Sequence, residues 1–183
     1  LIAILSVFVQ SLVPAKPIGW GIMLVYVIST IVLGSFGFEH NLYQYGAGPT
    51  VPYSDMNGRG RFWEGALVFR LYWGSFAALL MVAAYALWRR GTETRLAPRF
   101  ARLPSRLRGG AGAVAAVAAL AFVGLGGWIY YNTNVLNEYR PKPAREDFQA
   151  DYEKTLLRYE NLPQPTVAAV RLNVALFPHD RRV

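Results

Sequence analysis

The sequence predicts an all-α integral membrane protein, with three complete transmembrane helices and the end of a fourth, followed by a water-facing helix and the first strand of a β domain. Three observations lead to this prediction. Hydrophobic residues make up 54% of the chain and charged residues only 16%, which is more apolar than a globular surface requires. The apolar residues gather in runs long enough to cross a bilayer. The basic residues gather between two of these runs.

The predicted spans are the apolar runs over residues 18–38, 62–88 and 109–131. A run of about 18 residues suffices, because the hydrocarbon is about 30 Å thick and a helix rises about 1.5 Å per residue. The opening run, 1–13, is shorter and begins without Met. We therefore expect it to be the truncated end of an earlier span rather than a signal peptide, which makes 1–131 the transmembrane region of a longer protein.

The connector over residues 89–108 carries seven arginines and a single acid. By the positive-inside rule it faces the cytoplasm, so the loop over 39–61 and everything after residue 131 lie outside. We expect the arginines to contact anionic headgroups or a cytoplasmic partner. They are Arg89, Arg90, Arg95, Arg99, Arg102, Arg106 and Arg108.

Charge and cysteine content exclude some classes of function. The net charge of +8 does not indicate nucleic-acid binding here, because seven of the basic residues lie in the one connector between spans. The chain has no cysteine, which excludes disulfides, thiolate metal sites and cysteine nucleophiles. We expect no cofactor in this chain.

Two ionisable residues, Glu64 and Arg70, fall inside the predicted span over 62–88. Such residues are candidates for a transport or coupling role, because a charge in hydrocarbon costs a few kcal/mol or more. The plainer interpretation is favoured, in which Glu64 lies within a turn of the outer surface and Arg70 snorkels toward it or bonds to a neighbour.

The span over 109–131 is built largely from Gly, Ala and Val. Small residues let helix backbones approach closely, so we expect a tight helix–helix contact there. A phosphate cradle is disfavoured, because no strand precedes the glycines and no lysine follows them.

The outer loop is rich in turn-forming and aromatic residues, which predicts a re-entrant cap or a contact surface. Its candidate contact residues are Glu39, His40, Asp55 and Asn57. His40, Glu39 and Asp55 could in principle form a metal site. A solvated loop without metal is the favoured interpretation, because the spacing of these ligands is irregular.

Residues 132–165 are expected to form an extracytoplasmic helix and linker. Hydrophobic residues recur every three or four positions over 144–160, which predicts the helix, and the Pro-rich stretch over 162–165 predicts an extended connector. Apolar and polar residues alternate over 170–177, which predicts a strand with one buried face. We therefore interpret 166–183 as the start of a truncated β domain.

Several short motifs lie in the outer loop and in the second half of the chain: Phe38–Leu42, Tyr53–Gly58, Asn132–Tyr139, Asp151–Lys154, Arg158–Glu160, Leu162–Pro165 and Leu176–Pro178. These motifs resemble one family of bacterial fusion proteins, in which an ABC-2-type permease is joined to a membrane-anchored aminopeptidase of the M1 (gluzincin) family.

The resemblance implies the last permease helices and the junction to the peptidase's N-terminal β domain, in a bacterial inner membrane with a periplasmic C-terminus. In the family, an H-E-x-x-H helix and a later glutamate hold zinc. This chain has no such motif, so no catalytic residue is carried over and zinc is expected only in a missing downstream domain.

The resemblance favours a permease fragment that anchors a periplasmic peptidase. The candidate partners are the lipid bilayer, a separate cytoplasmic ABC ATPase subunit and a second copy of the chain. Two alternatives stay open. In the first, the helices only anchor an active peptidase. In the second, the chain is a structural or assembly membrane protein without transport or catalysis.

Overall fold

The computed structural model describes residues 1–56, 58–90, 95–163 and 166–174. The chain separates into two compact units, Leu1–Arg145 and Glu146–Val183. All regular elements among the described residues are helical, so the predicted α class is confirmed for them.

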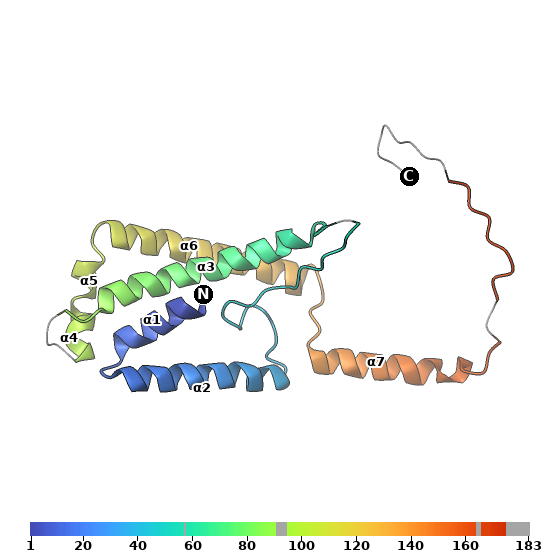
Figure 1. Ribbon diagram of the computed structural model, residues 1–183, viewed down its shortest axis with the longest axis horizontal. Coiled ribbons are helices and arrows are strands. Elements are labelled where there is room, and N and C mark those ends of the chain that lie inside the picture. Colours follow the sequence, from blue (N-terminus) through green and yellow to red (C-terminus); the bar gives the residue numbers. More distant parts are fainter. Residues whose placement is uncertain (57, 91–94, 164–165, 175–183) are drawn as a thin grey trace. The chain divides into compact units, whose positions relative to one another are not determined.

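The first unit consists of helices that pack side by side. Its elements are α1 (Ile2–Leu12), α2 (Lys16–Ser35), α3 (Phe62–Leu87), α4 (Leu96–Ala101), α5 (Leu103–Arg106), α6 (Gly110–Tyr130) and the π-helical turn η1 (Tyr131–Val135). Helix α3 is central: it packs against α6 on one side and α1 on the other, and α2 packs on α1 (Figure 1). The short helices α4 and α5 connect the ends of α3 and α6.

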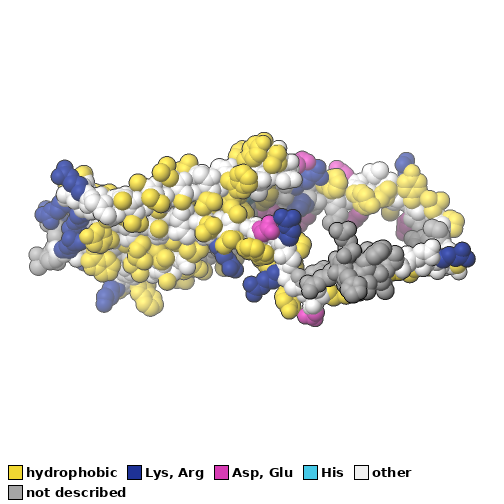
Figure 2. Space-filling model, turned by 90° about the horizontal axis from the view of Figure 1, so that it is seen from above, with side chains coloured by type: hydrophobic (Ala, Val, Ile, Leu, Met, Phe, Trp, Pro, Cys, Tyr) yellow, Lys and Arg dark blue, Asp and Glu magenta, His cyan; other side chains and the backbone are white. Residues whose placement is uncertain are grey.

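Three helices are long and apolar enough to cross a membrane, Lys16–Ser35, Phe62–Leu87 and Gly110–Val135. They have 20, 26 and 26 residues, and 20 residues already span about 30 Å. Most side chains of these three helices are at least partly exposed, and Figure 2 shows hydrophobic groups covering the visible sides of the helices. The three predicted spans are therefore confirmed as helices of membrane-crossing length, which indicates a membrane protein.

The ends of α2 differ slightly from the prediction. The helix begins at Lys16 because Pro17 lies in its first turn, where the missing N–H of proline removes no hydrogen bond. It ends at Ser35 because Gly37 adopts a positive φ of 86°. The N–H of Phe38 then donates to the carbonyl of Leu33 at 3.1 Å, which terminates the helix.

A small aromatic core joins α3 to α6. Phe69, Tyr72 and Trp73 of α3 and Ile129 of α6 are buried together. The ring of Tyr72 stacks on Phe122 of α6, with 4.6 Å between the centroids and 15° between the planes.

The tight contact predicted for the glycine-rich span occurs at one of its glycines. A Cβ added to Gly126 would lie 3.0 Å from the ring of Tyr72, whereas Gly124 and Gly127 face open space. The small-residue prediction is thus confirmed at Gly126, while the other two glycines leave an open face on α6.

Helix α7 (Lys142–Leu156) begins at the end of the first unit and forms most of the described structure of the second, followed by a 3₁₀ turn over Leu157–Tyr159. The helix predicted over 144–160 is therefore present. It starts earlier than expected because Pro143, like Pro17 of α2, is tolerated in a first turn.

The strand predicted over 170–177 is not seen in its described part. Residues 166–174 form neither helix nor strand, and Val170, Leu172 and Val174, expected to share a buried face, are 71%, 79% and 60% exposed. Alternation alone does not make a strand, because ladder hydrogen bonds need a partner strand, and the described part of the chain supplies none. Residues 175–177 lie outside the described part.

Candidate functional site

The outer loop folds back into the helical body at the level of Trp73. The indole Nε1 of Trp73 donates to the carbonyl oxygen of Asn41 at 3.1 Å. Tyr45 packs edge-on against Trp73 and Phe76, at centroid distances of 5.3 and 5.7 Å. Trp73 is the eleventh residue after Phe62, the start of α3, which corresponds to about 16 Å along the helix axis.

The position of the loop along α3 bears on whether the loop is re-entrant. Irregular backbone is tolerated within a membrane only where it is buried in protein or lines a water-filled cavity. Leu42 and Tyr45 both pack against the aromatic core, and a Cβ on Gly48 would lie 3.4 Å from Phe69. The loop is thus packed against α3, and the two arrangements, a re-entrant cap and a contact surface, both stay predictions.

His40 and Glu39 hold the chain that follows α6. His40 is buried, and its ring meets the ring of Tyr139 edge-on at 4.4 Å. The carboxylate of Glu39 pairs with Arg145 at 3.4 Å and accepts a hydrogen bond from the backbone N–H of Lys142, the first residue of α7. An acid at a helix N-terminus is stabilised by the helix dipole, so Glu39 caps α7.

The protonation of His40 follows from its surroundings. The N–H of Leu42 donates to Nδ1 of His40 at 3.0 Å, so this nitrogen carries no proton. Burial lowers the pKa of His40 below its usual range, because desolvation disfavours the charged imidazolium. The ring is therefore neutral at neutral pH and acts as a hydrogen-bond acceptor.

Glu39 and His40 also line a cavity of about 310 Å³, together with Tyr139 and Arg145. Asp55 is exposed and belongs to a different part of the loop, and Asn57 lies outside the described residues. Among the residues that are described, no three His, Asp or Glu side chains lie close enough to hold a metal ion. The structure thus brings together two of the four predicted loop residues, and their partners are Tyr139, Lys142 and Arg145.

Glu64 and Arg70 have different surroundings although both lie on α3. Glu64 is in the first turn and pairs with Arg61 at 3.2 Å, and both side chains are exposed. Arg70 is farther along the helix and lines a pocket of about 590 Å³ between α3 and the outer loop.

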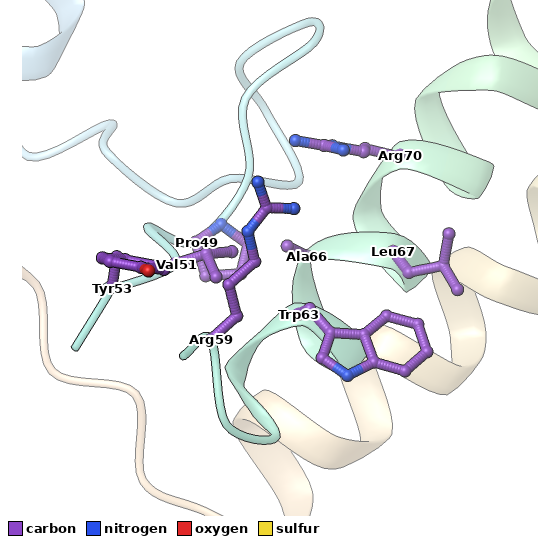
Figure 3. A pocket seen from close by; sticks show the side chains of 8 residues that line it. All are labelled: Pro49, Val51, Tyr53, Arg59, Trp63, Ala66, Leu67 and Arg70. Carbon is purple, nitrogen blue, oxygen red and sulfur yellow. The ribbon is translucent and has the colours of Figure 1, made fainter. Parts of the chain in front are cut away.

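In Figure 3 the side chains of Arg59, from the loop, and Arg70, from α3, point toward each other in this pocket. Tyr53 and Trp63 complete two of its sides. A smaller hollow of about 230 Å³ adjoins Arg70 beside residues 46–49 of the loop. The sequence singled out Arg70 but not Arg59, because a loop arginine is unremarkable until the fold places it beside another one.

Three of the seven arginines in the basic connector act inside the fold. Arg99 is 2% exposed, and its guanidinium donates to the carbonyls of Ser11 at 2.6 Å, Leu12 at 3.3 Å and Leu87 at 2.9 Å. Its Nε donates to the carbonyl of Arg95 at 3.2 Å. These bonds tie the C-terminal end of α1 to that of α3.

Arg89 and Arg106 complete the same arrangement. Arg89 donates to the carbonyls of Val13 and Pro14 at 3.0 and 2.9 Å. Arg106 donates to the carbonyl of Ala86 and, at 3.4 Å, to that of Trp88. The last carbonyls of a helix have no partner within the helix, and cations are favoured there by the dipole.

The other arginines of the connector face outward. Arg90 lies over the ring of Tyr85 at 5.4 Å, and Arg95, Arg102 and Arg108 are exposed. Lys and Arg side chains gather visibly at the end of the molecule where α4 and α5 lie (Figure 2). These outward arginines are the ones accessible for contact with lipid headgroups or with a partner protein.

No protein-family model, curated protein or solved structure matches the chain.

Proposed function

We propose that this chain is a membrane-spanning part of an ABC-2-like transport permease that anchors a periplasmic M1-type aminopeptidase domain in a bacterial inner membrane. The observation that carries the transport part is the loop that folds back to Trp73. Helices that serve only as an anchor need no such loop, whereas re-entrant loops and broken helices at membrane depth occur in channels and transporters.

Arg70 gives further support for a transport role. It lies eight residues beyond Phe62, the start of α3, which corresponds to about 12 Å along the helix. An ionisable residue at such a depth faces a water-filled cavity or a partner group, and here it lines the pocket under the loop.

The orientation in the proposal follows from the basic connector. The seven arginines of the connector mark the cytoplasmic side, so residues 39–61 and the chain after Val135 are periplasmic. A peptidase domain with its own zinc site would follow residue 183, and an ATPase subunit would bind on the cytoplasmic side. The resemblance of the short motifs to the fusion proteins supports this assignment.

The orientation is tested with single cysteines, because the chain has none of its own. Ser54→Cys and Thr155→Cys are expected to react with a membrane-impermeant maleimide added outside intact spheroplasts. Ser105→Cys is expected to react only after the membrane is opened. Labelling of Ser105→Cys from outside would overturn the orientation.

The transport role is tested first by sequencing the full reading frame and the adjacent genes. The proposal expects further spans upstream, an H-E-x-x-H helix downstream and an adjacent gene for a nucleotide-binding ATPase. The ATPase should co-purify with the full-length protein, and its ATP hydrolysis should rise in that complex. A purified full-length protein that binds and stimulates no such ATPase favours the alternative, a membrane anchor or assembly protein without transport.

A further inference from the structure

The pocket under the outer loop has the charge of an anion-binding site. Two guanidinium groups, from Arg59 and Arg70, point toward each other in it (Figure 3). Neither arginine has an ion pair or a hydrogen bond with any residue that the structure describes, and no acidic residue lines the pocket. The nearby acid on α3, Glu64, is already paired with Arg61.

We propose that this pocket binds a phosphate group, and that the group belongs to the headgroup of an anionic phospholipid. Guanidinium forks match the oxygens of phosphate, and charge-assisted bonds of this kind are about twice as strong as neutral ones. Two converging arginines supply up to four such bonds to one phosphate, and the hydroxyl of Tyr53 is a further donor in the same pocket.

The apolar side of the pocket favours a lipid over a free phosphate ion. Trp63 and Leu67 of α3 line it and are 49% and 41% exposed. Trp63 lies in the first turn of α3, and tryptophan is enriched where a helix passes the headgroup layer. An acyl chain is thus accommodated beside α3 while the phosphate meets the two arginines. This inference requires that α3 lie in a membrane and does not depend on transport.

The alternative is that Arg59 and Arg70 are only hydrated. In that case each arginine extends toward water independently. Removing an arginine then weakens ligand binding no more than removing a positive charge elsewhere on the chain. The two interpretations differ in whether the positions of the charges matter, which a matched pair of variants can measure.

The test measures binding of a short-chain phosphatidylglycerol to the full chain in a neutral detergent, with inorganic phosphate and glycerol phosphate as separate probes. The test variant is Arg59→Gln/Arg70→Gln. The control is Lys154→Gln/Arg158→Gln, which removes the same charge from exposed residues outside the pocket. Thermal unfolding verifies that each variant folds. If the double variant is unstable, Arg59→Gln alone is used, because its side chain lies on an exposed loop.

We expect the test variant to bind phosphatidylglycerol about tenfold more weakly or worse, and the control to bind as the unchanged chain does. Inorganic phosphate and glycerol phosphate should compete only weakly. If inorganic phosphate binds as tightly as the lipid, the lipid assignment is overturned and the ligand is a soluble phosphate. Equal losses in both variants, or no binding by the unchanged chain, would overturn the site itself.

Discussion

Trp73 and Asn41 are 32 residues apart in the sequence, yet the indole N–H of Trp73 donates to the carbonyl oxygen of Asn41 at 3.1 Å. The bond satisfies the one polar group of a buried side chain that lies well inside α3, and it holds a loop backbone against the helix at that depth. The loop and the helix are therefore expected to be energetically coupled.

Replacing Trp73 by Phe tests this coupling. Phe keeps an aromatic ring but leaves the Asn41 carbonyl without its donor, so we expect a loss of about 1–2 kcal/mol in the free energy of unfolding. A cysteine placed at Ala47 should also react faster with a water-soluble maleimide in this variant. Trp63→Phe is the control, since Trp63 is half-exposed. Equal labelling rates in the two variants would show that the Trp73 bond does not hold the loop.

The three long helices of this fold follow from the sequence, because each of their apolar runs is long enough to cross a bilayer. The contacts between elements do not follow in this way. The sequence marks Glu39 as a candidate contact residue but does not name Lys142 as its partner, and it does not pair Trp73 with Asn41, since these pairs form only once the helices have packed. Alternation over 170–177 predicted a strand, but residues 170–174 form none, because the described part of the chain supplies no partner strand.

The basic connector shows the same limit. The positive-inside rule uses the number of arginines near a span, and it makes no distinction between Arg99 and Arg102. The structure buries Arg99 against the carbonyls of two helix ends and leaves Arg102 exposed. A contribution to topology is therefore shared by all seven residues, while a contribution to stability belongs to particular ones.

Arg99→Gln should be strongly destabilising. Hydrogen bonds to a charged group contribute about 1.5–3 kcal/mol each, and buried carbonyls left without a donor carry a further penalty. We therefore expect the thermal unfolding midpoint in detergent to fall by several degrees or more, corresponding to about 3 kcal/mol. Arg102→Gln, which removes the same charge from an exposed position, should change the midpoint little. A similar small effect in both variants would mean that Arg99 does not hold α1 to α3.

Gly112→Ala should destabilise the start of α6. A Cβ at this position would lie 2.0 Å from the carbonyl oxygen of Leu107, and a backbone atom moves less readily than the tip of a side chain. Overpacking of this kind costs about 1–3 kcal/mol. Gly124→Ala is the matched control on the same helix, because nothing lies within 4 Å of its added Cβ. Since alanine favours helix over glycine, the control should be neutral or slightly more stable in thermal unfolding, and the opposite order of the two variants would refute the contact.

His40 should make the stability of the outer loop depend on pH. Burial lowers its pKa in the folded state, so between that value and the ordinary imidazole value of about 6.5 the unfolded chain binds more protons than the folded one. The stabilisation is thus complete above about pH 6.5 and is lost as the pH falls through that value toward the folded pKa. Protonation of Nδ1 also removes the acceptor for the N–H of Leu42.

The measurement is the thermal unfolding midpoint of the chain in detergent, taken at neutral pH and at about pH 5, above the ordinary carboxylate range. His40→Asn is the informative variant, because an Asn side chain can accept the N–H two residues on but does not titrate. It should be less stable at neutral pH, since the edge-on contact with Tyr139 is lost, and the part of the pH dependence due to His40 should disappear. His179→Asn changes the chain's other histidine and should keep that dependence. If His40→Asn retains the full dependence, another group titrates in this range and His40 does not couple the loop to pH.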